Sequence, residues 1–197
     1  TRSLSSAASD VYKRQSHPMS SITGFDGSKY VAFVSAEAHY SVLMSANVVG
    51  IGYQNLVKVA CDSRGRMKPE SLVEEIVRAR TNGQTPFCII ATSGTTVRGA
   101  FDPLKEIANI AHDNNIWLHV DAAWGGSSLF SKRFRKLMDG VELADSVCWD
   151  AHKMMGMPLI CSVFLTKSKD TLRAVCAHGD AAHYFCLLYT SPSPRDP

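Results

Sequence analysis

Two short, almost wholly apolar runs constrain the fold of this chain more than any other feature. They are residues 87–91 (FCIIA) and 116–120 (IWLHV), and runs of this kind are typical of strands covered on both faces of a parallel sheet. Helical patterns separate the strand-like runs: one begins at Pro69 and ends at 82–83 (NG), and another covers residues 104–114. This alternation predicts an α/β domain with three layers around a mainly parallel sheet. Further strands are expected at residues 30–35, 56–61, 146–149 and 161–165.

Composition limits the classes of protein that this sequence fits. Of its 197 residues, 45% are hydrophobic and 20% are charged, which is enough apolar material for one sizeable core. The net charge is only +3, with both signs interspersed, so neither a nucleic acid nor a membrane surface is expected as a partner. No apolar run approaches the ~18 residues that span a bilayer. The 6 cysteines form no C-x-x-C pair, which predicts reduced thiols and a cytoplasmic protein.

The two ends of the chain differ in character from the middle. Residues 1–15 and 186–197 lack the periodicity of the sequence between them, and the tail TSPSPRDP also has a composition that suits disorder. Both ends resemble translated sequencing-adapter sequence. We therefore expect residues 16–185 to be part of a larger domain, cut from a longer protein, with a short non-native segment on each side.

Polar residues with useful chemistry follow several of the expected strands. Ligands of mainly parallel sheets bind beyond the carboxyl ends of the strands, so we expect these side chains to converge on one pocket. A basic stretch at residues 131–140 is expected instead to be a solvated helix face. The residues expected in the pocket are His39, Thr95, Asp121, His152 and Lys153.

Lys153 lies in the apolar stretch 146–166, which is expected to belong to the core. A buried ammonium is costly unless it is paired or neutralised, and a Schiff base neutralises a lysine permanently. The alternative is a lysine whose stem lies on apolar surface while its ammonium reaches water. Asp121 also allows two interpretations, a ligand-binding carboxylate or the N-cap of a following helix. His119 is expected to be a satisfied core histidine without a functional role.

A lysine, an aspartate and an imidazole in one pocket suit pyridoxal 5′-phosphate. The lysine amine attaches to this cofactor, the carboxylate holds its pyridine nitrogen protonated, and a flat side chain stacks on its ring. A carboxylate about 4 Å from a pyridinium contributes roughly 4 kcal/mol at an effective dielectric constant near 20, which corresponds to about three pKa units. Asp121 alone therefore suffices to keep the nitrogen charged at neutral pH.

Four segments carry a resemblance to a known family. They are AEAHYS (36–41), ATSGTTVRGAFDP (91–103), HVDAAWGG (119–126) and DSVCWDAHKMMGMPLICS (145–162). In this order and spacing they resemble the group II pyridoxal-phosphate-dependent decarboxylases, most closely the branch of glutamate decarboxylase and cysteine sulfinate decarboxylase. The resemblance implies part of the large domain of a fold-type-I pyridoxal-phosphate-dependent transferase.

The resemblance also implies roles for individual residues. Lys153 forms the Schiff base with the cofactor and later donates a proton to the substrate carbon. Asp121 pairs with the pyridine nitrogen. His39 stacks on one face of the ring, Ala123 packs against the other, and Thr95 borders the ring and the substrate carboxylate.

The phosphate side of the expected site departs from the family. The resemblance places His152 near the cofactor phosphate, but the family commonly has Asn-Pro-His-Lys where this chain has Asp150-Ala151-His152-Lys153. An ionised carboxylate is repelled by a phosphate, whereas an amide can donate a hydrogen bond to it. We therefore expect Asp150, if it belongs to the cofactor site, either to point away from the phosphate or to be bridged by a donor such as protonated His152.

The function implied by the resemblance is α-decarboxylation of a small acidic amino acid. Glutamate and cysteine sulfinate are the main candidate substrates, and aspartate and 2,4-diaminobutyrate remain open. One alternative is transamination or elimination on the same fold, and a second is a catalytically inactive fragment. Because the family forms homodimers with active sites at the interface, we expect a homodimer for the full-length protein and weak cofactor binding by this chain alone.

Overall fold

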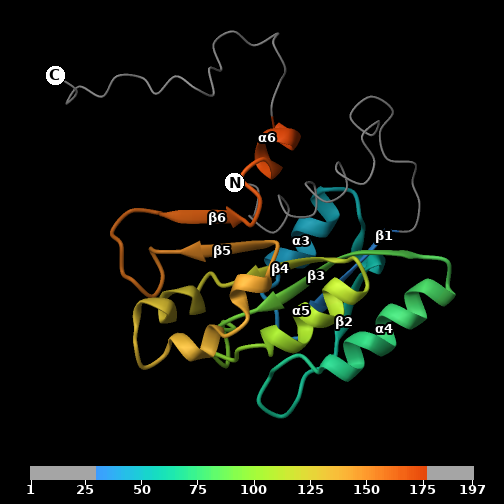
Figure 1. The fold of residues 1–197 in the computed structure, drawn as a ribbon, viewed down its shortest axis with the longest axis horizontal. Coiled ribbons are helices and arrows are strands. Elements are labelled where there is room, and N and C mark those ends of the chain that lie inside the picture. The colour runs from blue at the N-terminus through green and yellow to red at the C-terminus, as the bar shows by residue number, and fades with distance from the viewer. Residues whose placement is uncertain (1–29, 177–197) are drawn as a thin grey trace, which may run out of the picture.

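The computed structural model describes residues 30–176, so the two ends expected to be non-native lie outside the described range. Its six-stranded sheet has the order β2-β1-β3-β4-β5-β6, which can be followed in Figure 1. All neighbouring strands are parallel except β5 and β6, which pair antiparallel. The expected α/β fold with a mainly parallel sheet is confirmed. The strands are β1 (Tyr30–Ser35), β2 (Leu56–Val59), β3 (Thr85–Thr92), β4 (Trp117–Asp121), β5 (Ser146–Asp150) and β6 (Ser162–Thr166).

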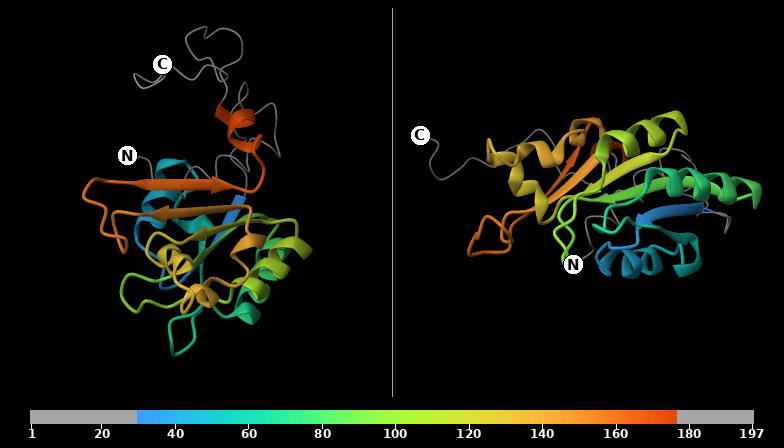
Figure 2. Two further views of the ribbon diagram at one scale, coloured as in Figure 1. Left: turned by 60° about the vertical axis from the view of Figure 1, so that its left-hand side comes forward. Right: turned by 90° about the horizontal axis from the view of Figure 1, so that it is seen from below.

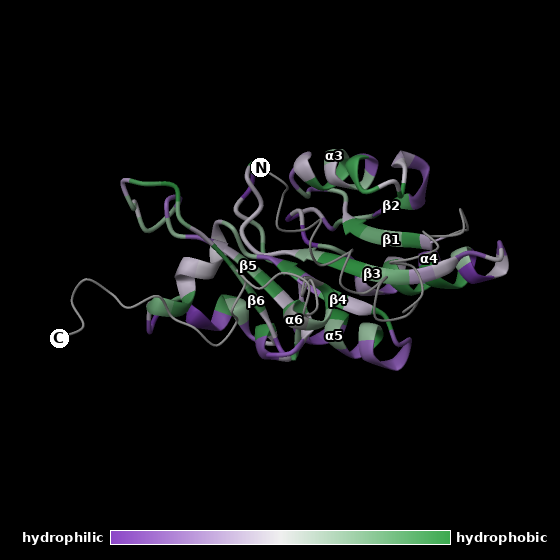
Figure 3. Cartoon of the chain, turned by 90° about the horizontal axis from the view of Figure 1, so that it is seen from above, coloured by the Kyte–Doolittle hydropathy of each residue, from purple (hydrophilic) through white to green (hydrophobic). Residues whose placement is uncertain are grey.

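Helices cover both faces of the sheet. Helices α4 and α5 pack on one face and α3 packs on the other, and two views from opposite directions show this arrangement (Figures 2 and 3). Helix α4 follows its sequence signals, with Pro69 in the first turn and the C-cap Asn82 before a left-handed Gly83. The helices are α3 (Ser41–Val48), α4 (Pro69–Thr81), α5 (Leu104–Asp113) and α6 (Thr171–Cys176).

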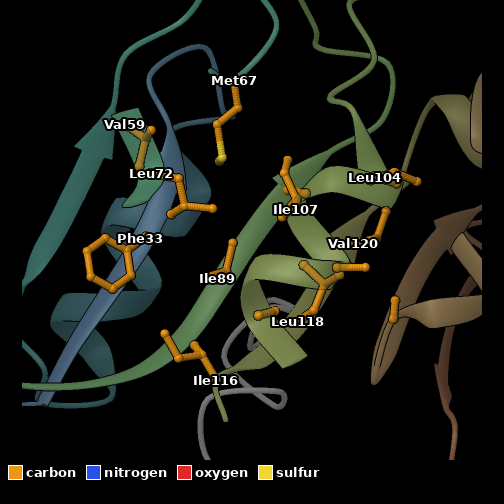
Figure 4. Packing of buried hydrophobic residues seen from close by; sticks show 14 of the residues in the cluster. Phe33, Val59, Met67, Leu72, Ile89, Leu104, Ile107, Ile116, Leu118 and Val120 are labelled. Atoms are coloured by element: carbon orange, nitrogen blue, oxygen red, sulfur yellow. The ribbon is translucent and has the colours of Figure 1, made fainter. Parts of the chain in front are cut away.

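The core is divided by the sheet into two apolar clusters. The larger cluster joins Phe33, Ile89 and Leu118 of the central strands to Leu72 of α4 and Ile107 of α5 (Figure 4). The smaller cluster joins the other face of the sheet to α3. Burial of each of these aliphatic or aromatic side chains contributes about 1.5–3 kcal/mol to stability, so the strands that carry the loops described below are held rigidly.

One segment differs from the sequence prediction, and the antiparallel edge strand also has a physical reason. The basic stretch 131–140 forms no α-helix; it contains the short 3-10 helix η3 (Arg135–Met138), and of that helix only Met138 is buried. A stretch without a continuous apolar face gains too little from packing to hold an α-helix. Strand β6 is antiparallel because no helix separates it from β5, and a parallel return needs a long crossover. Two further 3-10 helices, η2 (Gly125–Phe130) and η4 (Val141–Leu143), occupy the same β4–β5 connection.

Candidate functional site

The carboxyl ends of four strands lie side by side, because β1, β3, β4 and β5 are consecutive and parallel in the sheet. The strand register places Thr92, Asp121 and Cys148 in one row across β3, β4 and β5. Side chains in such a row point to the same face of a sheet. The structure thus places the expected site residues at the ends of these strands or in the loops that follow them.

Asp121, the last residue of β4, presents its two carboxylate oxygens to different surroundings. Its Oδ1 accepts hydrogen bonds from the backbone N–H of Ala123 at 3.1 Å and from the Cys148 thiol at 3.4 Å. Burial raises the pKa of the Cys148 thiol, which keeps that thiol protonated and able to donate. No hydrogen bond to Oδ2 is found within residues 30–176. This i to i+2 contact is an Asx turn and not the helix N-cap that the sequence left open, because the N-cap of the next helix, η2, is Trp124. It uses only one of the two carboxylate oxygens.

Lys153 is held in a turn that directly follows β5. Its Nζ lies 2.9 Å from Oδ2 of Asp150, and its backbone N–H donates to the carbonyl of Asp150 at 3.1 Å. The backbone N–H of Asp150 in turn donates to the carbonyl of Ala123 at 3.3 Å. A continuous chain of contacts thus runs from the Asp121 carboxylate through Ala123 and Asp150 to the Lys153 amine.

The carboxylate of Asp150 pairs with Lys153, because a side chain three residues along a turn returns over the first one. His152 makes a different contact: its Nδ1 lies 3.1 Å from the backbone carbonyl oxygen of Cys161 and 3.2 Å from the Cys161 backbone nitrogen. His152 therefore ties the two ends of the β5–β6 loop together.

The apolar stretch around Lys153 is not core within the described residues. Much of residues 154–160 is exposed, with Leu159 at 78% and Ile160 at 89% of their full accessible surface. The reason is geometric: this loop extends past the end of the sheet, where α4, α5 and α3 do not reach (Figure 1). The expectation that residues 146–166 are buried as a whole is therefore wrong. Lys153 itself keeps 30% of its side-chain surface.

His39 and Thr95 lie at the same edge of the sheet, but they make their hydrogen bonds locally. Nδ1 of His39 accepts from the backbone N–H of Ser41 at 3.3 Å and lies 2.8 Å from the Ser41 hydroxyl oxygen, and the His39 ring centroid lies 4.2 Å from that of Tyr40. Oγ1 of Thr95 is buried and accepts from the backbone N–H of Ala100 at 3.0 Å. Within residues 30–176, no hydrogen bond or ion pair joins either side chain to Asp121 or Lys153.

His119 is buried in β4, as expected, but only one of its ring nitrogens is satisfied. The indole N–H of Trp117 donates to Oγ of Ser146 at 2.9 Å, and this hydroxyl lies 2.9 Å from Nδ1 of His119. The Ser146 hydroxyl has one proton and two lone pairs, so it can pair with Nδ1 of His119 in either tautomer while it accepts from Trp117. Nε2 has no partner among the described residues, and burial lowers the pKa of His119 to about 4.

Sequence reasoning missed two residues: Thr92 at the end of β3, and Asp102 in the loop between β3 and α5. The Thr92 hydroxyl is buried opposite Asp121 and has no hydrogen-bond partner among residues 30–176. The backbone N–H groups of Thr92 and Met67 donate to the buried carboxylate of Asp102, at 2.7 Å and 2.6 Å respectively. The only sequence signal was the density of hydroxyl residues in ATSGTT, which does not distinguish Thr92 from Thr95.

Glycines allow the loops after β3 and β4 to pack directly on each other. A Cβ on Gly125 would overlap the carbonyl oxygen of Ser93, and a Cβ on Gly94 would lie 2.7 Å from the backbone nitrogen of Gly125. Gly126 lies against the ring of Trp149, where an added Cβ would be 2.7 Å from Cδ1. The Gly125 N–H also donates to the Ser93 carbonyl at 3.0 Å. This packing fixes the positions of the two loops that flank Asp121.

The model of the pyridoxal-dependent decarboxylase conserved domain matches residues 9–180 of this chain. The chain belongs to the pyridoxal-dependent decarboxylase family. Human acidic amino acid decarboxylase GADL1 is 47% identical over 163 residues, which are 82% of this chain and 31% of that protein. Mouse cysteine sulfinic acid decarboxylase is 47% identical over 152 residues, which are 77% of this chain and 31% of that protein. The chain thus spans less than a third of the length of these relatives.

Solved structures agree with the family assignment. The crystal structure of mouse CSAD in apo form superimposes with a TM-score of 0.85 at 40% identity, covering 87% of this chain and 37% of that one. A decarboxylase domain from Vibrio parahaemolyticus superimposes with a TM-score of 0.77 at 28% identity, covering 88% of this chain and 39% of that one. The fold of residues 30–176 is therefore that of this decarboxylase family.

The residues at this edge of the sheet fit the cofactor of the pyridoxal-dependent decarboxylases. An amine, a carboxylate with one uncommitted oxygen and a buried unpartnered hydroxyl occur in adjacent positions, at Lys153, Asp121 and Thr92. The amine suits the aldehyde of this cofactor, and the carboxylate suits its pyridine nitrogen. Among residues 30–176 no cluster of His, Cys, Asp or Glu could hold a metal ion. In the same part of the chain, no helix combines the length and the apolar character needed to cross a membrane.

Proposed function

We propose that the protein to which this chain belongs removes the α-carboxylate of a small acidic amino acid, using pyridoxal 5′-phosphate. The observation that carries the proposal is the chain of contacts from Asp121 through Ala123 and Asp150 to Lys153. It joins a carboxylate with a free oxygen to an amine, at the edge of the sheet where ligands of such folds bind. The two relatives named above, which act on acidic amino acids and on cysteine sulfinic acid, support the same class of substrate.

In this proposal each residue has a task that its surroundings favour. Lys153 Nζ attaches the cofactor, and after carbon dioxide leaves it returns a proton to the substrate carbon. Asp121 Oδ2 accepts the N–H of the pyridine ring, while Oδ1 remains fixed by Ala123 and Cys148. The bound cofactor supplies a ring that withdraws the electron pair left behind by the departing carboxylate.

Four further residues complete the proposed site. The His39 imidazole, which accepts a hydrogen bond from the Ser41 backbone N–H, offers a flat face for stacking against the cofactor ring. Thr95 borders the ring, and His152, whose Nδ1 is held by the backbone of Cys161, presents Nε2 toward the phosphate side. Ala123 is small, so it allows the ring to approach the turn after β4.

The substrate is proposed to be glutamate or cysteine sulfinate. Both carry a second acidic group, which agrees with the printed activities of the relatives named above. Transamination and elimination use the same cofactor and the same Lys153, so the reaction has to be assigned from its products. Carbon dioxide release without formation of a keto acid supports decarboxylation, and keto-acid formation in its place would overturn the proposal.

The decisive test of the cofactor assignment is the visible absorbance of the protein after addition of pyridoxal phosphate. Full-length wild-type protein should develop a new band that survives removal of free cofactor by gel filtration, and full-length Lys153→Ala should lack that band. Lys167→Ala is the matched control, because this exposed lysine lies beyond β6 and should leave the band unchanged. An equal band in Lys153→Ala would refute the role of Lys153.

We also propose that the protein forms a homodimer in the cytoplasm. The exposed apolar residues of the loop 154–160 suit the dimer interface. Unpaired thiols suit a reducing compartment such as the cytoplasm, and they occur here at Cys61, Cys88, Cys148 and Cys161. Sedimentation equilibrium of the protein at several concentrations tests the dimer. A monomer at all concentrations would contradict it.

A further inference from the structure

We propose that Asp150 is a positioning residue that holds Lys153 in a closed ion pair, which must open before the amine can attach to a carbonyl compound. The inference rests on the proposed function, because it concerns the lysine that is proposed to attach the cofactor. It predicts that Asp150 slows the attachment and that removal of its charge makes Lys153 more reactive.

Geometry supports a closed turn rather than a chance surface contact. Two interactions join the same two residues: the Nζ–Oδ2 ion pair at 2.9 Å and the backbone hydrogen bond at 3.1 Å from the Lys153 N–H to the Asp150 carbonyl. Asp150 is the last residue of β5, and its own N–H is anchored to the Ala123 carbonyl. Its side chain keeps only 14% of its surface, whereas that of Lys153 keeps 30%. The carboxylate is thus the fixed partner, and the lysine is the one that can leave.

The charges around the pair also favour the closed state. A second carboxylate, Asp121, lies one strand away in β4, and Asp150 itself has no other cationic partner within residues 30–176. The imidazole of His152 is engaged with the Cys161 backbone on the other side of the turn. Lys153 is therefore the group that compensates the Asp150 carboxylate, and moving it away leaves that carboxylate half-buried without a partner.

Attachment to a carbonyl compound requires an unprotonated Lys153 amine that is free of the ion pair. Nζ attacks a carbonyl carbon with its lone pair, so the ammonium first gives up a proton to solvent. A carbon–nitrogen double bond then forms, and the carbonyl oxygen leaves as water. An ammonium that donates to Asp150 has no lone pair available, so the ion pair and the attack exclude each other. A partly exposed ion pair is worth up to ~1 kcal/mol, which corresponds to a rate change of up to about fivefold.

The test measures the reactivity of Lys153 in the cofactor-free protein. Full-length protein is treated briefly with acetic anhydride, and acetylation of Lys153 is quantified by peptide mass spectrometry relative to the exposed Lys105. Asp150→Asn should raise the relative rate up to about fivefold. Asp150→Glu, which retains the charge, should stay close to wild type. Asp113→Asn is the matched control, because it removes one carboxylate at the far end of α5, where the side chain is 78% exposed.

A second measurement does not depend on the variants. In wild-type protein, 1 M salt weakens ion pairs by screening, at a Debye length of about 3 Å, so the acetylation of Lys153 relative to Lys105 should increase with salt. An unchanged or slower rate in Asp150→Asn that is folded by circular dichroism would overturn the proposal. If Asp150→Asn does not fold, the absence of a salt effect in wild type overturns it.

Pyridoxal phosphate is then used as the second carbonyl probe, with the adduct on Lys153 trapped by borohydride. Faster trapping in Asp150→Asn than in wild type supports the proposal. Trapping that is not faster in this variant, while acetylation is, would overturn it for the cofactor. Absence of any adduct on Lys153 in all proteins would instead refute the proposed function, so the two failures are distinguishable.

Discussion

Asp102 carries a buried carboxylate whose protonation is expected to change the stability of the fold at mildly acidic pH. Burial raises its pKa from 3.8 to about 6, although the N–H groups of Met67 and Thr92 act in the opposite direction. Because the folded state binds the proton more tightly than the unfolded state, the stabilisation is complete below pH 3.8 and is lost as the pH rises through about 6. The difference between 3.8 and about 6 corresponds to about 3 kcal/mol, at about 1.36 kcal/mol for each pKa unit.

The perturbation that isolates this effect is Asp102→Asn, which removes the titrating proton and keeps one oxygen acceptor. The free energy of unfolding is measured by urea titration, followed by tryptophan fluorescence, for both proteins between about pH 3 and pH 7. The stability of wild type minus that of the variant should fall by about 3 kcal/mol across this range. Asp113→Asn changes an exposed carboxylate at the end of α5. The stability of wild type minus that of this control variant should show no comparable fall.

The result that would refute the reasoning is a stability difference that stays constant or increases with pH. It would mean that the two short hydrogen bonds to Asp102 outweigh its burial, so that the carboxylate is ionised throughout. Titration of the Asp102 carboxyl carbon by NMR gives an independent check, because a midpoint near the value of a free aspartate would lead to the same conclusion.

Three further outcomes are expected. His119 is the opposite case, because burial lowers its pKa from 6.5 to about 4. The stability that depends on neutral His119 is therefore lost as the pH falls through this range. His119→Gln should remove up to about 3 kcal/mol of that loss in the same urea assay. Gly125→Ala should cost about 2 kcal/mol or more, since its methyl group meets the Ser93 carbonyl, whereas Gly99→Ala, with no atom within 4 Å, should cost only the ~1 kcal/mol of its left-handed φ. Asp121→Asn should lower the rate of carbon dioxide release about a thousandfold while the protein stays folded. A pH profile of His119→Gln parallel to wild type, equal costs at the two glycines, or full activity of Asp121→Asn would contradict the respective argument.

Helix α4 shows how much of the fold could be predicted from the sequence. Its start at Pro69 and its end before 82–83 follow from local backbone chemistry, and both agree with the structure. The apolar pattern was less decisive for burial: Leu72 and Ile76 are buried, but Val73 and Val77 are exposed at 44% and 57%. Four apolar residues in two turns make a stripe wider than the sheet can cover, and only packing selects the buried part.

The loop around Lys153 shows where sequence reasoning failed. Hydropathy predicted that residues 146–166 are core, yet much of residues 154–160 lies exposed past the end of the sheet. Hydropathy records what a side chain favours, and it contains no information about how far the neighbouring helices extend. The same limit applies to the basic stretch 131–140. Its charges were compatible with a solvated α-helix, but the structure has only the short 3-10 helix η3 there.

The sequence by itself determined the alternation of strands and helices and the positions of Asp121 and Lys153 after two neighbouring strands. These features depend on backbone propensities and on periodicities that extend over a few residues. Only the tertiary structure decided that Lys153 pairs with Asp150, that Asp121 keeps one oxygen free, and that His119 has an unsatisfied nitrogen. Such pairings depend on the register between strands and on the path of turns, and a difference of one residue in either would change every partner.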